Sequence, residues 1–98
     1  MSTDEADTGG WQETYEGRAR AYLQQFLQEN APGLQTIIRG YVVRMNVGTG
    51  SNVEAIAAEI FQETVIEVLS HANRFHPEMQ PRAWFLAIAA NILKRYRV

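Results

Sequence analysis

The sequence predicts an all-α fold, a small four-helix bundle, and three observations lead to that prediction. Apolar residues recur at steps of three and four along most of the chain, as they do on one face of an α-helix. Glycine, proline and small polar residues interrupt this pattern where connections between helices would lie. The length of 98 residues, of which 46% are hydrophobic, allows one core and one domain.

Residues 1–10 are small and acidic and end in two glycines, so we expect a disordered acidic leader before one helical domain over residues 11–98. The first helix of that domain is predicted from Trp11 to a break at residues 30–33, NAPG. Its apolar stripe comprises Tyr15, Ala19, Tyr22, Leu23, Phe26 and Leu27.

A second helix is predicted over residues 34–45. Its β-branched residues leave a strand possible, but a spacing nearer 3.6 than 2 favours a helix. The apolar stripe comprises Leu34, Ile37, Ile38, Tyr41, Val42 and Met45. Glycines and small polar residues then predict a loop over residues 46–52.

The third helix is expected to begin near Asn52 or Val53, with Ser51 or Asn52 as its N-cap, and to end near Ala72. Its apolar face comprises Ile60, Phe61, Thr64, Val65, Val68 and Leu69. After a short connector at residues 76–80, the last helix begins at Pro81, a residue suited to a first turn, and runs to the chain end. Its inward positions are Phe85, Ile88, Ala89, Ile92 and Tyr96.

The residues offer little for catalysis. The chain has no cysteine, and neither His71 nor His76 is followed at i+3 or i+4 by a carboxylate or a second histidine. We therefore predict no enzymatic activity, no metal and no cofactor. The chain shows no signal-peptide layout and no apolar run near the roughly 20 residues that span a bilayer, so we expect a cytoplasmic protein.

Charge is unevenly distributed along the chain, although the net charge is only -2. Acidic residues dominate the first 16 positions and basic residues the last 17, an asymmetry that suggests separate partners for separate faces. In the third helix, Glu59, Glu63 and Glu67 follow one another at i+4 steps beside Gln62. This row is either a solvated face or a docking surface for a basic partner.

The last helix carries the opposite charge. Arg82 stands at its start, and the cations near its end are Lys94, Arg95 and Arg97. Cations at a helix C-terminus favour the helix dipole, but they also suit contacts to phosphates, with Asn91 as a candidate for contacts to bases or sugars. Trp84 is expected in the core rather than on a base-stacking surface.

Four motifs with consistent spacing connect residues 58–97 to a known family. They are EIFQE at residues 59–63, Arg74-Phe75 with Pro77, RAWF at residues 82–85, and Ile88-Ala89 with Asn91. Together they resemble region 2 of the extracytoplasmic-function (ECF) sigma factors of the sigma-70 family. The resemblance implies a helical domain that acts in bacterial transcription initiation, with RNA polymerase core, promoter DNA and an anti-sigma factor as its partners.

In that family the first motif helix docks on the clamp helices of the polymerase β′ subunit. The resemblance therefore assigns polymerase binding to Glu59, Gln62, Glu63 and Glu67. The connector and last helix hold the non-template strand of the minus-ten promoter element. This implies DNA contacts by His76, Pro77, Glu78, Met79, Gln80, Arg82, Asn91, Lys94 and Arg97.

The sequence departs from the family pattern at several positions. The connection at residues 45–52 is longer than usual, and Arg95 replaces a commonly acidic residue. The family's second DNA-binding domain, region 4, is expected to be absent from the chain. An alternative interpretation is a small helical protein-interaction module, anti-sigma-like or a decoy, whose acidic face binds a partner and whose basic end does not bind DNA.

Overall fold

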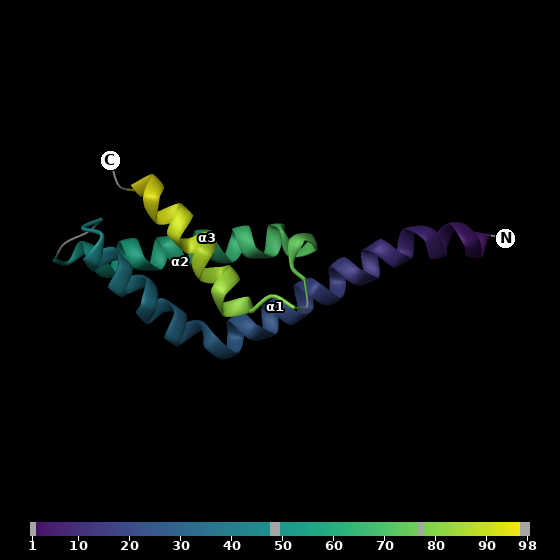
Figure 1. The fold of residues 1–98 in the computed structure, drawn as a ribbon, viewed down its shortest axis with the longest axis horizontal. Helices are drawn as coiled ribbons and strands as arrows, with labels where there is room; N and C mark the ends of the chain where they lie inside the picture. Colours follow the sequence, from purple (N-terminus) through teal and green to yellow (C-terminus); the bar gives the residue numbers. More distant parts are fainter. Residues whose placement is uncertain (1, 48–49, 77, 97–98) are drawn as a thin grey trace.

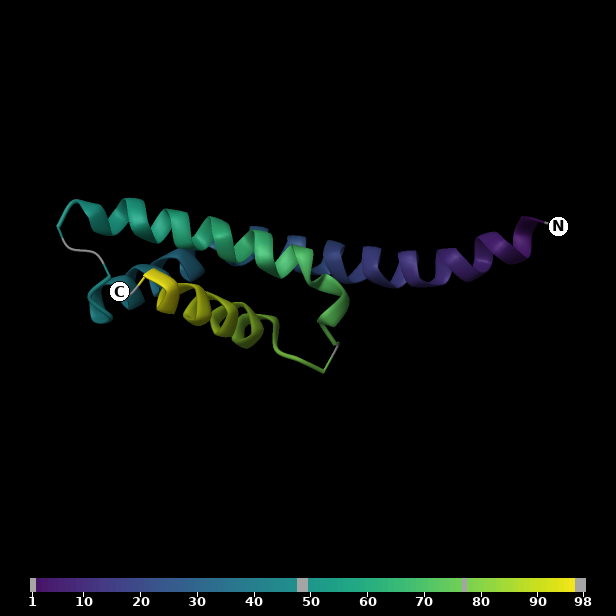
Figure 2. The ribbon, with the colours of Figure 1, turned by 90° about the horizontal axis from the view of Figure 1, so that it is seen from above.

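The computed structural model describes residues 2–47, 50–76 and 78–96, with side-chain positions from residue 17 onwards. In these ranges the chain forms helices α1 (Ser2–Arg44), α2 (Asn52–Ser70) and α3 (Pro81–Tyr96) and the short 3-10 helix η1 (Ala72–Arg74), with no strand. Figures 1 and 2 show α2 and α3 packed on the second half of α1. The all-α prediction is confirmed for the described residues.

The predicted number of helices is wrong, because the described residues form three α-helices rather than four. Residues 30–33, expected to end the first helix, lie inside α1, and the helix bends in this stretch (Figure 1). Pro32 removes one backbone donor and costs a helix interior about 3 kcal/mol. The helix continues because Leu27 and Leu34, on either side of the bend, are both buried in the same core.

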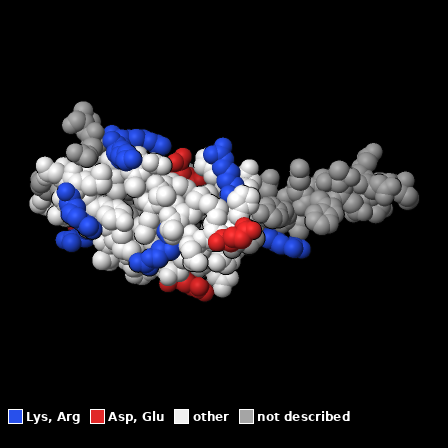
Figure 3. All heavy atoms as spheres, viewed as in Figure 1, with Lys and Arg blue, Asp and Glu red and all other residues white. Residues whose placement is uncertain are grey.

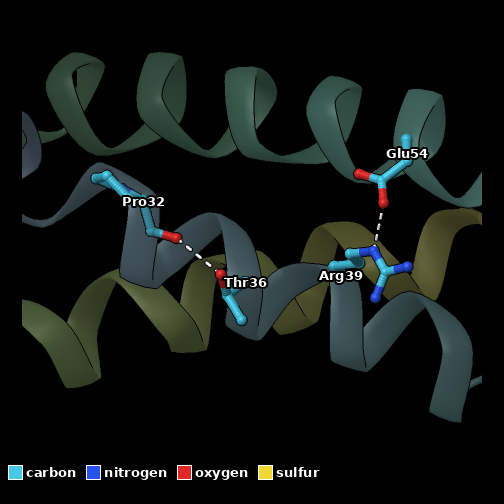
Figure 4. Close-up of polar contacts among 4 residues, drawn as sticks. All are labelled: Pro32, Thr36, Arg39 and Glu54. Carbon is cyan, nitrogen blue, oxygen red and sulfur yellow. Dashed lines mark hydrogen bonds and ion pairs between the residues drawn. The ribbon is translucent and has the colours of Figure 1, made fainter.

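Two side chains supply local hydrogen bonds at the bend. The Asn30 side-chain amide donates to the carbonyl of Phe26 over 2.8 Å, and the Thr36 hydroxyl donates to the carbonyl of Pro32 over 3.0 Å. Figure 4 shows the second of these bonds, one turn before Arg39. Such side-chain bonds to the preceding turn accompany bent helices.

Helix α1 also includes residues 2–10, for which the sequence predicts disorder. The division of the chain into an acidic leader and a domain stays a prediction.

Helix α2 begins where the sequence predicts. Ser51 is the N-cap residue, but its side chain makes no capping hydrogen bond. At the other end, α2 stops at Ser70, two residues before the predicted end, because His71 leaves helical geometry at φ -111° and ψ 28°. The chain then continues as η1, and Phe75 closes it by donating its backbone N–H to the Ala72 carbonyl over 3.1 Å.

One hydrophobic core lies between the helices. Its buried hydrophobic residues come from all four elements and from Phe75: Leu23, Leu27, Leu34, Ile38, Val42, Val53, Ala57, Ile60, Val68, Ala72, Phe75, Phe85, Ala89, Ile92 and Leu93. Thr64 is the buried polar residue among the described positions, and its hydroxyl donates to the Ile60 carbonyl over 2.7 Å. In the described part of the chain, every fully buried side-chain nitrogen and oxygen therefore has a partner.

The predicted inward face of the last helix is largely confirmed. Phe85, Ala89 and Ile92 are buried, whereas Ile88 and Tyr96 are partly buried. Over the described residues, no helix is both long enough and apolar enough to cross a membrane.

Candidate functional site

The acidic residues of α2 and the neighbouring Gln62 differ in burial: two of the four side chains are exposed, and two pack against the end of α3. We call Glu59, Gln62, Glu63 and Glu67 the acidic stripe. Val53, Ala57, Ile60, Thr64 and Val68 occupy the buried side of α2 at steps of three and four, so the stripe falls outside that side. Glu59 and Gln62 are exposed, while Glu63 and Glu67 are partly buried.

The end of α3 packs against Glu63 and Glu67. The Tyr96 hydroxyl donates to Glu63 Oε1 over 3.0 Å, and Arg95 Nη2 lies 3.7 Å from Glu67 Oε2. His71 Nε2 is 3.9 Å from Glu67 Oε1, an ion pair only when the imidazole is protonated. These contacts offset the repulsion between carboxylates one turn apart. The acidic and basic regions, predicted to serve separate partners, therefore meet within the molecule at this point.

Tyr96 has an altered acidity as a result. Partial burial, the hydrogen bond and negative charge of Glu63, and the smaller charge and hydrogen-bond effects of Glu59 raise the pKa of Tyr96 from 10.0 to about 12. Each of these causes disfavours the phenolate. Near neutral pH, Tyr96 is therefore a protonated donor that holds the end of α3 on α2.

The connector before α3 forms a tight turn, which we call the capture loop (residues 76–80). Met79 donates its backbone N–H to the His76 carbonyl over 2.9 Å, and the Gln80 carbonyl accepts the N–H of Trp84 over 3.0 Å. The side chains of His76, Glu78, Met79 and Gln80 are exposed. A backbone hydrogen bond therefore joins Met79 to His76, while these four side chains face solvent. Pro77, also predicted to contact DNA, lies outside the described residues.

Three aromatic rings from three parts of the chain lie next to one another, and two of them, Phe75 and Trp84, stand on either side of the capture loop in the sequence. The Phe75 ring lies 5.4 Å from the Trp84 ring and 5.7 Å from the Tyr22 ring, centroid to centroid. Trp84 is partly buried against the core, in agreement with its prediction as a core residue. Tyr22 was predicted within the buried stripe of the first helix, but it is 52% exposed. It sits at the edge of that stripe, where periodicity alone does not separate buried from exposed positions.

The predicted DNA-binding residues of α3 do not all share one face. Asn91 and Lys94 are exposed and three residues apart, so they are neighbours on the helix surface. Arg82 is also exposed, but about two and a half turns separate it from Asn91, which places it across the helix. Neither Arg82 nor Lys94 joins an ion pair with another described residue. Arg97 lies outside the described residues.

On the molecular face drawn in Figure 3, basic side chains are spread over the surface rather than gathered into one patch. No group of three or more histidine or acidic side chains within the described ranges is arranged to hold a metal ion.

Comparison with known proteins gives one family. The model of the family described as Sigma-70 region 2 matches residues 26–97, which include α2, η1, α3 and the second part of α1. No curated protein and no solved structure matches the chain.

Proposed function

The chain belongs to the Sigma-70 region 2 family, whose domains act in promoter recognition by RNA polymerase, and we propose that it is the region 2 domain of an ECF-type sigma factor. In this proposal the acidic stripe docks on the clamp helices of the β′ subunit. The capture loop, together with Asn91 and Lys94, holds the non-template strand of the minus-ten element. The protein acts in the cytoplasm, and an anti-sigma factor competes for these surfaces.

The observation that carries this proposal is the exposure of Glu59 and Gln62 on α2. They lie three residues apart on one surface, within the residues that the family model matches. Neither side chain forms an ion pair with another described residue, and Glu59 has only the smallest share in raising the pKa of Tyr96. A carboxylate and an amide so placed are available to a basic, hydrogen-bonding partner.

The proposal that the capture loop binds the non-template strand is supported by the exposure of the loop and by the aromatic rings next to it. The exposed side chains of His76, Glu78, Met79 and Gln80 are accessible to an unstacked base. Exposed cations on α3 suit contacts to the phosphates of the same strand.

The test is direct binding of the full chain to the clamp-helix segment of β′. Glu59→Lys places a positive charge in the docking surface at an exposed position, and we expect binding to weaken roughly tenfold or more. Glu29→Lys, an exposed charge reversal on α1, is the matched control and should bind like wild type.

Glu59→Lys should disturb the fold less than a change at Glu63, because the hydrogen bond and charge of Glu63 act more strongly on Tyr96 than those of Glu59 do. Equal binding by Glu59→Lys and wild type would remove the docking assignment. If Glu29→Lys weakens binding as much as Glu59→Lys does, net charge rather than this surface governs binding.

A further inference from the structure

Tyr22 is more exposed than Phe75 and Trp84, the other two rings of this aromatic group. Its ring is stacked on Phe75 with 5.7 Å between centroids and 26° between planes, yet 52% of the residue is exposed. Phe75 itself is only 5% exposed. One face of the tyrosine ring is thus supported by a buried ring, while the residue remains open to solvent. This arrangement is a rigid aromatic platform on the surface.

The platform lies beside the proposed base-capture site. Phe75, on which Tyr22 is stacked, directly precedes His76, the first residue of the capture loop. Phe75 also contacts Trp84 in the first turn of α3. A strand whose base occupies the loop would therefore pass close to Tyr22.

Two cations lie close in sequence to the stacked rings. Arg18 lies one turn before Tyr22 on the same side of α1, and Arg74 directly precedes Phe75. Both are exposed, and neither joins an ion pair among the described residues. Glu29, about two turns further along α1, accepts a hydrogen bond from Gln25 over 3.2 Å. The charged residues closest in sequence to the two stacked rings are therefore basic, beside the apolar neighbours Ala19 and Phe26 on α1.

We propose that Tyr22, with Arg18 and Arg74, is a second stacking site for a nucleobase of the single strand held at the capture loop. An exposed ring flanked by cations matches the chemistry of single-stranded nucleic acid, whose bases stack on aromatic rings while its phosphates meet cations. Tyrosine and arginine are also frequent at protein interfaces, so a protein partner is the competing occupant, and binding to the clamp-helix segment distinguishes the two. Tyr22 and Arg18 precede residue 26, where the family match begins, whereas Arg74 lies within the match, so the site combines residues from outside and inside the matched range.

The proposal rests on the proposed function, and the test separates the two. The full chain is titrated against a fluorescent single-stranded oligonucleotide of mixed sequence and against the same sequence as a duplex. Tyr22→Ala should weaken binding to the single strand by roughly five- to a hundredfold, the range that a base stacked on an aromatic ring contributes. Tyr22→Phe keeps the ring and should bind within about twofold of wild type.

The cations are tested by salt dependence. Arg18→Ala and Arg74→Ala should each weaken binding and lower the slope of log K against log salt by about 0.7, the value for one phosphate on a single strand. Ile66→Ala, a truncation of another exposed apolar side chain on α2, is the matched control and should leave both the affinity and the slope unchanged.

Single-strand binding by Tyr22→Ala at the wild-type level would overturn the proposal, as would equal losses for single strand and duplex. Absence of salt-dependent single-strand binding by the wild type would also overturn it. If Tyr22→Ala binds the strand normally while Asn91→Ala does not, the second site fails and the proposed function stands. If Tyr22→Ala instead loses binding to the clamp-helix segment of β′ and keeps its binding to DNA, Tyr22 is a protein contact.

Discussion

At the scale of single residues, Tyr96 and Arg95 connect the end of α3 to the acidic stripe of α2. The Arg95 pair with Glu67 is largely exposed, with 65% of the arginine side chain accessible, and such surface pairs contribute about 0–1 kcal/mol. The Tyr96 bond to Glu63 is partly buried and is therefore the stronger of the two connections. Glu59 and Gln62 remain available for binding.

Tyr96 provides a pH-dependent prediction. Its pKa in the folded chain is about 12, whereas an unfolded tyrosine titrates at its ordinary value of 10.0. Between these values the folded state binds more protons than the unfolded state, so the free energy of unfolding should fall as pH rises from about 10 to 12. Ultraviolet titration of tyrosinate should show one group ionising late, and Tyr96→Phe should remove that group.

The Tyr96→Phe variant is also the control for stability. It lacks the titrating hydroxyl, so its stability should decline less steeply over the same alkaline range. An identical decline in the two proteins would mean that Tyr96 titrates normally and that Glu63 does not hold it.

At the scale of elements, the continuity of α1 is the feature that most affects the architecture. The helix passes through Pro32 and Gly33, two residues that individually disfavour a helix interior. Side-chain bonds from Asn30 and Thr36 lie in the bend, and the ion pair of Arg39 with Glu54 connects the later part of α1 to α2 (Figure 4). The bend lets both halves of the apolar stripe of α1 contribute to one core.

Gly33 tests this continuity. It is exposed, and a Cβ placed on it would meet no atom within 4 Å. Gly33→Ala should therefore raise the free energy of unfolding by about 0.5–1 kcal/mol, because alanine loses less backbone entropy in a helix. Urea unfolding followed by circular dichroism measures the change.

Gly50→Ala is the matched control, because Gly50 has a positive φ of 59° in the loop before α2. The same substitution should there lower stability by about 1 kcal/mol, since an L-residue is strained in the left-handed region. A destabilising Gly33→Ala would show that α1 is interrupted at the position where the sequence pattern places its break.

At the scale of the whole molecule, a single core holds together two surfaces with different chemistry. Phe85 lies at its centre, 1% exposed, with its ring 5.8 Å from that of Phe61 on α2. The helix that carries Asn91 and Lys94 is thereby fixed on the helix that carries Glu59 and Gln62. Loss of this packing would remove both binding surfaces together.

Phe85→Ala should accordingly lower the free energy of unfolding by about 3–5 kcal/mol, a large share of the 5–15 kcal/mol typical of small domains. Ile66→Ala, at a residue 62% exposed, should change it by less than about 0.5 kcal/mol. Urea unfolding gives both values. Comparable losses in the two variants would contradict the assignment of Phe85 to the core.

Local sequence patterns predicted much of this architecture. The apolar spacing predicted the all-α class and most buried positions, and Pro81 marked the start of α3. The motifs at residues 59–63 and 82–91 predicted the region 2 family that the comparison confirms. These features depend on neighbours three or four residues apart, which a sequence displays directly.

Only the tertiary structure decided how these elements meet. Residues 30–33 carry a local signal for a break, but burial of Leu27 and Leu34 in the same core outweighs it. The contact of Tyr96 with Glu63 joins residues 33 positions apart, and the stack of Tyr22 on Phe75 joins still more distant ones. Helical periodicity describes one helix at a time, so neither contact was visible until the helices were packed.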